Sequence, residues 1–436
     1  LCPIGVSSDG APHRVFPHVI CRYQRGVPDS YEDVGAVLSS RLTDLRASTP
    51  FQSLTFENFE IQLLSILFDQ DFVSALRQLR ISIDNHQNPE EPPEPEKLVS
   101  LLAETPQLSG LRLLALNAPG ENLRLLADSP HLQSLEHLIL EEFDLLPKSL
   151  EELSQSSLAK QLTTLEISSR WMTDDHVKAL VKGDWPRLHT LKLWGRISLS
   201  ALEIVAEHDG MPLLASLSLM SRFQAPKQIP LIDPRPNWSL RRLALCEFHP
   251  GTDGIAALAS SPILSELHTL ELWHNEITTK GFSSLAKSDY LRNLQHLEIV
   301  DDDLKGGQMK ELTQGDLLRQ LTTFNLAAGT NPLPCTFREG AQLIEAMNLD
   351  SIRHLKLSGI PLGARGANVL ANQSWIRKLR LFELKWGRIL DDGVETLFNA
   401  LNHNQLAYLS LIEPRLSEEM KKWIREQPVG YPVNIH

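Results

Sequence analysis

The sequence predicts an α/β solenoid in which each turn contributes one strand and one helix. Three observations support this prediction: a short apolar phrase recurs along the chain, its copies follow one another at nearly constant spacing, and the apolar periodicity changes after each copy. The clearest copy is Leu267-x-x-Leu270-x-Leu272. A repeat of this length indicates units that cannot bury their apolar face alone and therefore stack to share one core.

Each copy of the phrase predicts one strand. We take its middle apolar residue as the marker, and from Leu114 onward successive markers lie 24 to 27 residues apart, with one interval of 31. The markers are Leu54, Leu79, Leu114, Leu138, Leu165, Leu191, Leu217, Leu243, Leu270, Leu297, Phe324, Leu355, Phe382 and Leu409. One strand per repeat, at equivalent positions, predicts a parallel sheet along the solenoid.

The residues after each strand predict a helix. Apolar residues return seven and fifteen positions past the marker, as at Ile277 and Leu285, and glycine stands eleven positions past it in the best copies. The apolar spacing changes there from alternation to every third or fourth residue, which is the helical period. Side chains suited to cap the first helical turn stand at the expected helix starts, namely Thr173, Thr278, Asp391 and Ser417.

With these strands, the turn Trp273-His274-Asn275-Glu276-Ile277 and the Gly-x-x-x-Leu helix starts, residues 51–436 resemble the leucine-rich repeat family. Within it they are similar to the helix-containing subtype typified by ribonuclease inhibitor. The resemblance implies a horseshoe with a parallel sheet on the concave face and helices on the convex face. The late repeats and the ending Met420–Arg425 resemble bacterial members, especially planctomycete-type ones. Most copies lack the turn asparagine, so the resemblance implies a function only as a class.

The repeat pattern divides the chain into three parts. Residues 51–416 form the predicted solenoid of about 14 repeats, with an acidic, proline-rich insertion at 86–97 that predicts an exposed, extended loop. Residues 1–50 contain no repeat, and a predicted helix from Tyr31 to Leu45 gives them the role of an N-terminal helical cap. Residues 417–436, with a helix from Ser417 to Glu426, form the predicted C-terminal cap.

Composition restricts the function classes. The formal net charge of −12 argues against nucleic acid or an anionic membrane surface as the direct ligand. No apolar run is long enough to cross a membrane, and the start Leu1–Gly5 does not resemble a signal peptide. The four cysteines are scattered; Cys2 and Cys21 remain a possible pair, but free thiols are favoured, which predicts a reducing, cytoplasmic location.

The concave face carries the predicted site. The position three residues past the marker is apolar and aromatic in the middle repeats, where it holds Trp194, Met220 and Trp273, and the neighbouring position brings Glu271 and Glu298. Exposed aromatic residues in a column indicate a surface for a protein partner. The alternative is that inserted or terminal segments cover this column, or that a shift in register has placed core residues in it. We favour the partner.

Further candidate residues lie beside this column. Asp301, Asp302 and Asp303 follow a strand directly and, with His274, offer a site for a cation or a basic partner, with a solvated acidic loop as the favoured alternative. Trp386 opens the second of two Trp-Gly-Arg-Ile copies, the first of which begins at Trp194, and the two are offset by one residue within their repeats. Repeat drift explains this offset better than a nucleic-acid motif.

The sequence predicts no catalytic, cofactor-binding or metal site. It contains no phosphate-binding glycine loop, Gly-x-Ser-x-Gly turn, Cys-x-x-Cys pair or His-Glu-x-x-His helix. His137, His296 and His354 share one strand position, but they stand in repeats that are not adjacent, too far apart for one metal ion. The prediction is a non-catalytic scaffold for a protein partner. The alternatives are a regulatory or accessory subunit of a separate enzyme and, least favoured, a hydrolase around the acidic loop.

Overall fold

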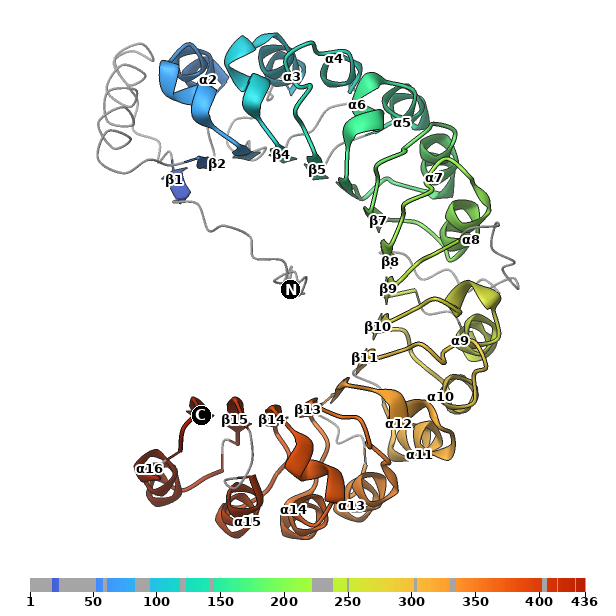
Figure 1. Cartoon of the computed structure of the whole chain (residues 1–436), viewed down its shortest axis with the longest axis vertical. Helices are drawn as coiled ribbons and strands as arrows, with labels where there is room; N and C mark the ends of the chain where they lie inside the picture. The colour runs from blue at the N-terminus through green and yellow to red at the C-terminus, as the bar shows by residue number, and fades with distance from the viewer. Residues whose placement is uncertain are drawn as a thin grey trace. The chain divides into compact units, whose positions relative to one another are not determined.

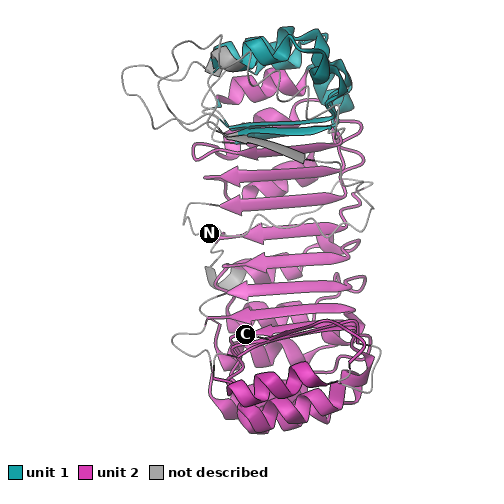
Figure 2. Cartoon of the chain, turned by 90° about the vertical axis from the view of Figure 1, so that its left-hand side faces the viewer, with its two compact units in different colours: residues 1–145, 156–162 teal, residues 146–155, 163–436 magenta. Residues whose placement is uncertain are grey.

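The structure is a computed structural model that describes residues 18–22, 52–57, 61–82, 95–117, 123–141, 145–221, 238–248, 251–301, 304–329, 335–401, 406–413, 415–427 and 429–435. The chain divides into two compact units. Unit 1 comprises residues 1–145 and 156–162, and unit 2 comprises residues 146–155 and 163–436 (Figure 2). Each unit is an α/β repeat solenoid, which confirms the predicted fold class.

Unit 1 contains a parallel sheet whose strands pair in chain order. Its strands are β1 His18–Arg22, β2 Ser53–Glu57, β3 Gln78–Ser82, β4 Leu113–Asn117 and β5 His137–Glu141. Its helices are α2 Ile61–Phe68, α3 Pro95–Glu104, α4 Arg124–Ala127 and α6 Ser157–Gln161, with 3-10 turns η1 Asp71–Ala75 and η2 Pro106–Gly110. These helices lie on one side of the strands (Figure 1).

Unit 2 continues the same plan, with parallel strands that again pair in chain order. The strands are β6 Thr164–Ser168, β7 Thr190–Gly195, β8 Ser216–Ser221, β9 Arg242–Cys246, β10 Thr269–Trp273, β11 His296–Asp301, β12 Thr323–Ala328, β13 His354–Ser358, β14 Leu381–Lys385, β15 Tyr408–Ile412 and β16 Val433–Ile435. Within this unit the strands line the inner side of an arc (Figure 1).

The helices of unit 2 cover the other side of its sheet (Figures 1 and 2). They are α5 Pro147–Ser154, α7 Asp174–Val181, α8 Ser200–Glu207, α9 Gly251–Ala259, α10 Thr279–Ala286, α11 Gly306–Glu311, α12 Leu317–Gln320, α13 Phe337–Ala346, α14 Gly363–Ala371, α15 Asp391–Leu401 and α16 Glu418–Glu426. The 3-10 turns are η3 Pro262–Leu264, η4 Leu312–Gln314 and η5 Ser374–Lys378. No described helix covers the opposite face of either sheet, which we call the open face.

The core of each unit consists of the repeated apolar positions. The markers, from Leu54 to Leu409, are all at most 1% exposed. The residues fifteen positions past the marker, such as Leu180 and Leu285, are also buried and come from the helices. Burial of a leucine side chain contributes about 2 kcal/mol, so rows of them across stacked repeats supply the main stabilising energy of the fold.

The helix starts follow the predicted pattern with one difference. Thr278 accepts a hydrogen bond from the N–H of Gly281, Ser417 accepts one from Met420, and Thr173 forms a capping box with His176. These side chains satisfy N–H groups that have no partner inside the helix. Asp391 was predicted to be an N-cap, but it is the first residue of α15, and its carboxylate bonds to the next repeat instead.

The turns that follow β10 and β14 each begin with a non-glycine residue that has a left-handed backbone. His274 has a φ of 52° and Trp386 a φ of 53°. The N–H of each donates to a carbonyl of the next strand, that of Val300 for His274 and that of Ile412 for Trp386. A left-handed non-glycine residue carries a steric cost, and these hydrogen bonds help to offset it.

An acidic side chain of the following repeat fixes each of these turns. The buried carboxylate of Asp301 accepts a hydrogen bond from the N–H of Ile277 at 3.3 Å. The buried carboxylate of Glu413 accepts hydrogen bonds from the N–H groups of Gly387 and Arg388. Both acids stand four residues past their own marker. The turns are therefore held by the repeat that comes after them.

Two features near the N-terminus differ from the predictions. Residues 18–22, predicted to be part of a segment without repeats, form β1 and pair in parallel with β2. The predicted extended loop at 86–97 ends earlier than expected, because α3 begins at Pro95. Proline is favoured in the first helical turn, since its missing N–H has no helical partner there. The predicted helix from Tyr31 to Leu45 and residues 86–94 of the insertion lie outside the described residues.

Candidate functional site

The predicted column of side chains exists in unit 2. Pairing of the strands places Trp194 beside Met220, Met220 beside Cys246, Cys246 beside Trp273, and Trp273 beside Val300. These residues lie on the open face, because they alternate with the buried markers along each strand. The spacing of the repeats alone was therefore sufficient to predict which residues are neighbours.

The column is only partly exposed. Trp194, Met220 and Trp273 are each half-buried, and Cys246 between the last two is 3% exposed. The sequence predicted water-facing side chains here, so the observed surface is flatter and offers less of each aromatic ring than expected. Half-buried aromatic residues are still suited to binding, because their rotamers are already restricted by their neighbours.

The neighbouring column, one residue past the marker, carries charge. Lys192 pairs with Glu166 across adjacent strands at 2.8 Å. The Arg242 guanidinium donates hydrogen bonds to Glu271 at 2.9 to 3.2 Å, and the Glu271 side chain is 9% exposed. Removal of either member of this nearly buried pair would leave the other charge without a partner.

Glu298 connects the two columns. It stands beside Glu271 in the strand register, and its Oε1 accepts a hydrogen bond from the indole Nε1 of Trp273 at 3.1 Å. Burial raises the pKa of the Glu298 carboxyl above its ordinary value, and the nearby Glu271 raises it further, whereas hydrogen bonds from Asn325 and Trp273 and the charge of Lys356 oppose the shift. An added cation at this point would stabilise the carboxylate.

The histidines of the strand starts do not form a metal site. His296 and His354 flank Thr323, so one strand separates them. Burial is the main cause that lowers the pKa of both imidazoles, which are therefore neutral at pH 7. Among the described residues, no group of three or more His, Cys, Asp or Glu side chains is placed to hold a metal ion.

Asp301 does not belong to a solvated acidic loop. It is 4% exposed and bonds to the N–H of Ile277 inside the solenoid, so neither a partner nor a cation reaches it from the open face. Asp302 and Asp303 lie outside the described residues. His274 is half-buried in the left-handed turn that Asp301 supports. The prediction for Asp301 is therefore wrong, because its hydrogen-bond donor lies in the preceding repeat.

Trp386 lies apart from the main column. It follows β14 in the second left-handed turn and is 44% exposed, whereas Trp194 is a strand residue. In this repeat the position three residues past the marker is held by Lys385 and not by Trp386. Lys385 pairs with Glu383 at 2.9 Å. The two Trp-Gly-Arg-Ile copies thus have different places in their repeats, as their offset predicted.

Comparisons with known proteins give a fold likeness only. No protein-family model matches the chain, and no curated protein matches it. Among solved structures, an internalin (inlF) of Listeria monocytogenes is 16% identical, with a TM-score of 0.43, over 84% of this chain and 92% of the other. A chain of the yeast Rad7 and Elc1 complex is 15% identical, with a TM-score of 0.44, over 93% and 88%. At these values the likeness says nothing about a partner.

No helix among the described residues combines the length and the apolar character needed to cross a bilayer. Cys246 and Cys335 are buried, and burial raises the pKa of the Cys335 thiol to about 11. A thiol with so high a pKa is a poor nucleophile at pH 7.

Proposed function

We propose that this chain is a non-catalytic scaffold that holds a protein partner on the open face of unit 2. The observation that carries the proposal is the register of the strands, which brings Trp194, Met220 and Trp273 into one column. Tryptophan is the residue type most enriched among those that dominate binding energy at protein interfaces. Parallel strands about 4.8 Å apart make such a column a track for an extended or helical partner segment.

The charges beside the column define the partner further. Glu271 forms an ion pair with Arg242, whereas no ion pair joins Glu298 to a cation among the described residues. Burial already disfavours the charged form of Glu298. A partner with a lysine or arginine next to an apolar side chain would match both columns, since the cation relieves the cost of the buried carboxylate. We therefore propose a partner segment that combines apolar anchors with a basic residue.

The helix-containing subtype of leucine-rich repeats belongs to the same proposal. A helix follows β6, β7, β10 and β13 directly, namely α7, α8, α10 and α14, which supports this subtype over one with extended return segments. A bacterial, planctomycete-type source and a cytoplasmic location remain predictions from the sequence.

Affinity capture with matched tryptophan variants tests the proposal. We expect a protein retained by the wild-type chain to be lost from the W194A/W273A double variant, because truncation of a central interface tryptophan costs about 2 kcal/mol or more, roughly thirtyfold in Kd. The control is W171A. Trp171 is 51% exposed, stands in the loop between β6 and α7 and not in a strand, and its ring lies against the guanidinium of Arg196.

Folding of the variants decides how a loss is interpreted. Circular dichroism and thermal unfolding should show that W194A/W273A remains folded, because both side chains are only half-buried. Unfolding of this variant would identify the two residues as core and remove the proposed surface. Retention of the same proteins by the folded double variant and by the wild type would also overturn the proposal.

The second candidate is a regulatory or accessory subunit of a separate enzyme. It uses the same surface, and it differs only in what binding does to the partner. The activity of the captured partner, measured with and without the chain, separates the two: a change on binding that W194A/W273A abolishes favours the regulatory subunit.

A further inference from the structure

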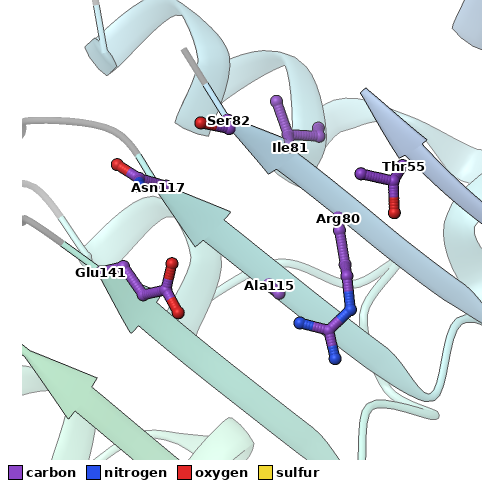
Figure 3. Close-up of a pocket in the computed structure, with 7 residues that line it drawn as sticks. All are labelled: Thr55, Arg80, Ile81, Ser82, Ala115, Asn117 and Glu141. Carbon is purple, nitrogen blue, oxygen red and sulfur yellow. The ribbon is translucent and has the colours of Figure 1, made fainter. Parts of the chain in front are cut away.

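A hollow of about 310 Å³ lies on the open face of unit 1 (Figure 3). It is separate from the tryptophan column, which belongs to unit 2. Its lining is polar and apolar in similar parts and consists of Thr55, Arg80, Ile81, Ser82, Ala115, Asn117 and Glu141. These residues come from β2, β3, β4 and β5.

The hollow results from one small side chain among longer ones. The register places Thr55 beside Arg80 and Arg80 beside Ala115. Two residues further along the same strands, Ser82 lies beside Asn117 and Asn117 beside Glu141. Ala115 is itself only 7% exposed, but it has no atoms beyond Cβ and so takes up little of the space between Arg80 and the row of Ser82, Asn117 and Glu141.

Arg80 supplies the charge of this hollow. Arg80 is exposed, and its side chain extends across β4 beside Ala115 (Figure 3). No ion pair joins it to another described residue, whereas Arg112 and Arg124 of the same unit pair with Glu136 and Asp128. A guanidinium presents several N–H donors in a planar fork that matches a carboxylate or another oxyanion.

We propose that this hollow binds a carboxylate side chain from an acidic segment of a protein. Arg80 would take the carboxylate in a bidentate contact, and the hydroxyl of Ser82 and the amide of Asn117 offer further donors. The inference rests on the proposed function in one respect, namely that the occupant is part of a protein partner. The two sites differ in the ligand they bind and in their place in the chain, since the unit 2 surface favours apolar and basic groups.

The charges favour a carboxylate over a phosphate. A phosphate group carries a charge of about −1.5 to −2 at pH 7, which one arginine does not balance. Glu141 faces the same hollow and would repel the excess negative charge (Figure 3). A single carboxylate matches the single guanidinium.

Fluorescence anisotropy with a labelled peptide of alternating alanine and glutamate tests the site, and the peptide with glutamine in place of glutamate is its control. We expect the glutamate peptide to bind the wild-type chain and the glutamine peptide to bind at least tenfold more weakly. R80Q should weaken binding of the glutamate peptide at least tenfold. R124Q removes the same charge from α4, where Arg124 pairs with Asp128, and should change binding less than twofold.

A115L separates the hollow from the charge. It fills the space above β4 and keeps Arg80, so we expect the same loss as for R80Q. Equal binding of both peptides, or unchanged binding by R80Q or A115L in folded protein, would overturn the proposal. Displacement of the peptide by inorganic phosphate at concentrations where acetate has no effect would overturn the choice of a carboxylate.

The two proposals fail separately. W194A/W273A should bind the glutamate peptide as the wild type does, because the tryptophans lie in the other unit. If protein capture fails and the peptide still depends on Arg80, the unit 2 proposal alone is lost. If capture depends on the tryptophans and the peptide does not bind, the carboxylate site alone is lost.

Discussion

The indole N–H of Trp273 donates a hydrogen bond to the Glu298 carboxylate across two neighbouring strands, at an Nε1–Oε1 distance of 3.1 Å. This bond holds the ring of the tryptophan in one orientation and at the same time supplies a donor to a carboxylate that burial disfavours. The aromatic column and the charged column of the open face are therefore one surface, in which a change at Glu298 also changes how Trp273 is presented.

E298Q should alter the pH dependence of stability. The folded-state pKa of Glu298 is raised, so its contribution to the free energy of unfolding is complete below the unfolded-state pKa and is lost as the pH rises through the folded-state pKa. Glutamine cannot titrate and keeps an acceptor for Trp273. We expect E298Q to be at least as stable as the wild type near pH 8, with the advantage absent near pH 4.

Thermal unfolding across this pH range measures the effect. E166Q is the control, because Glu166 is a carboxylate of the same column that is neutralised by Lys192 at 2.8 Å. If the stability of E298Q depends on pH in the same way as that of the wild type, ionisation of the buried Glu298 carboxyl does not destabilise the fold.

N275A should strongly destabilise the repeats around β10. The Asn275 side chain is 1% exposed, and its amide donates to the carbonyls of Leu245 and Trp273 and accepts from the N–H of Phe248. Each buried group left without a partner costs about 1–3 kcal/mol, so we expect a loss of roughly 3 kcal/mol or more in the free energy of unfolding.

Urea denaturation of N275A and N293A provides the comparison. Asn293 also links two repeats, through a bond from its amide to the carbonyl of Ser265, but this bond is exposed. Water can replace it, so the cost of N293A should stay below about 1 kcal/mol. Similar losses for the two variants would mean that burial does not set the strength of these links.

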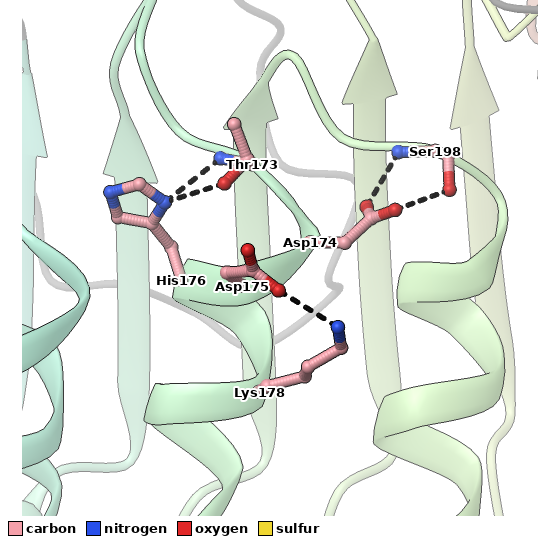
Figure 4. A network of polar contacts seen from close by, with 6 residues as sticks. All are labelled: Thr173, Asp174, Asp175, His176, Lys178 and Ser198. Carbon is pink, nitrogen blue, oxygen red and sulfur yellow. Dashed lines mark hydrogen bonds and ion pairs between the residues drawn. The ribbon is translucent and has the colours of Figure 1, made fainter.

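Asp174 and Asp175 give a matched test of a contact between repeats (Figure 4). The Asp174 carboxylate accepts hydrogen bonds from the N–H and the hydroxyl of Ser198, at 2.7 and 2.5 Å, whereas Asp175 pairs only with Lys178 on the surface of its own helix. D174A should cost about 2 kcal/mol, since hydrogen bonds to charged groups contribute roughly 1.5–3 kcal/mol. D175A should leave the midpoint of thermal unfolding unchanged.

A double-mutant cycle checks the pairing. If the energy of D174A comes from Ser198, the effects of D174A and S198A are not additive, and the double variant costs little more than D174A alone. Additive losses would place the energy elsewhere. Asp391 bonds to Ser417 in the same way near the end of the chain, so D391A should behave as D174A does.

The sequence was sufficient to predict the core and the register, for a physical reason. Each strand alternates between the core and the open face, and a shift of one residue would expose every leucine. The repeated leucines therefore fix which residues are neighbours, and the column from Trp194 to Val300 follows from counting alone. The exposed fraction of each side chain in that column could not be predicted from the spacing. It depends on the sizes of the neighbouring side chains, as at Cys246.

Other features depend on contacts that a local pattern does not show. Asp301 stands at the start of three consecutive aspartates, a pattern typical of solvated loops, yet its donor Ile277 lies one repeat earlier. A signal was present: Asp301 and Glu413 both stand four residues past a marker, in repeats that follow a bulky residue at the same position, His274 or Trp386. The hollow at Arg80 does not follow from the repeat pattern, because it depends on the small side chain of Ala115 beside longer ones.

Glu413 should make the stability of the last repeats depend on pH near neutrality. Its carboxyl is 1% exposed, and burial raises its pKa from 4.5 to about 7, although hydrogen bonds from the N–H groups of Gly387 and Arg388 oppose the shift. The raised pKa means that this stabilising contribution is complete below about pH 4.5 and is lost as the pH rises through about 7. A shift of this size corresponds to about 3 kcal/mol.

E413Q keeps one acceptor for the turn and cannot ionise, so it should be more stable than the wild type near pH 8 and similar to it near pH 4. E413A removes both acceptors and should be less stable than E413Q at every pH. E395Q changes an exposed carboxylate on α15 and serves as the control. Parallel stability profiles for the wild type and E413Q from pH 4 to 8, measured by urea denaturation, would show that the carboxyl does not titrate in this range.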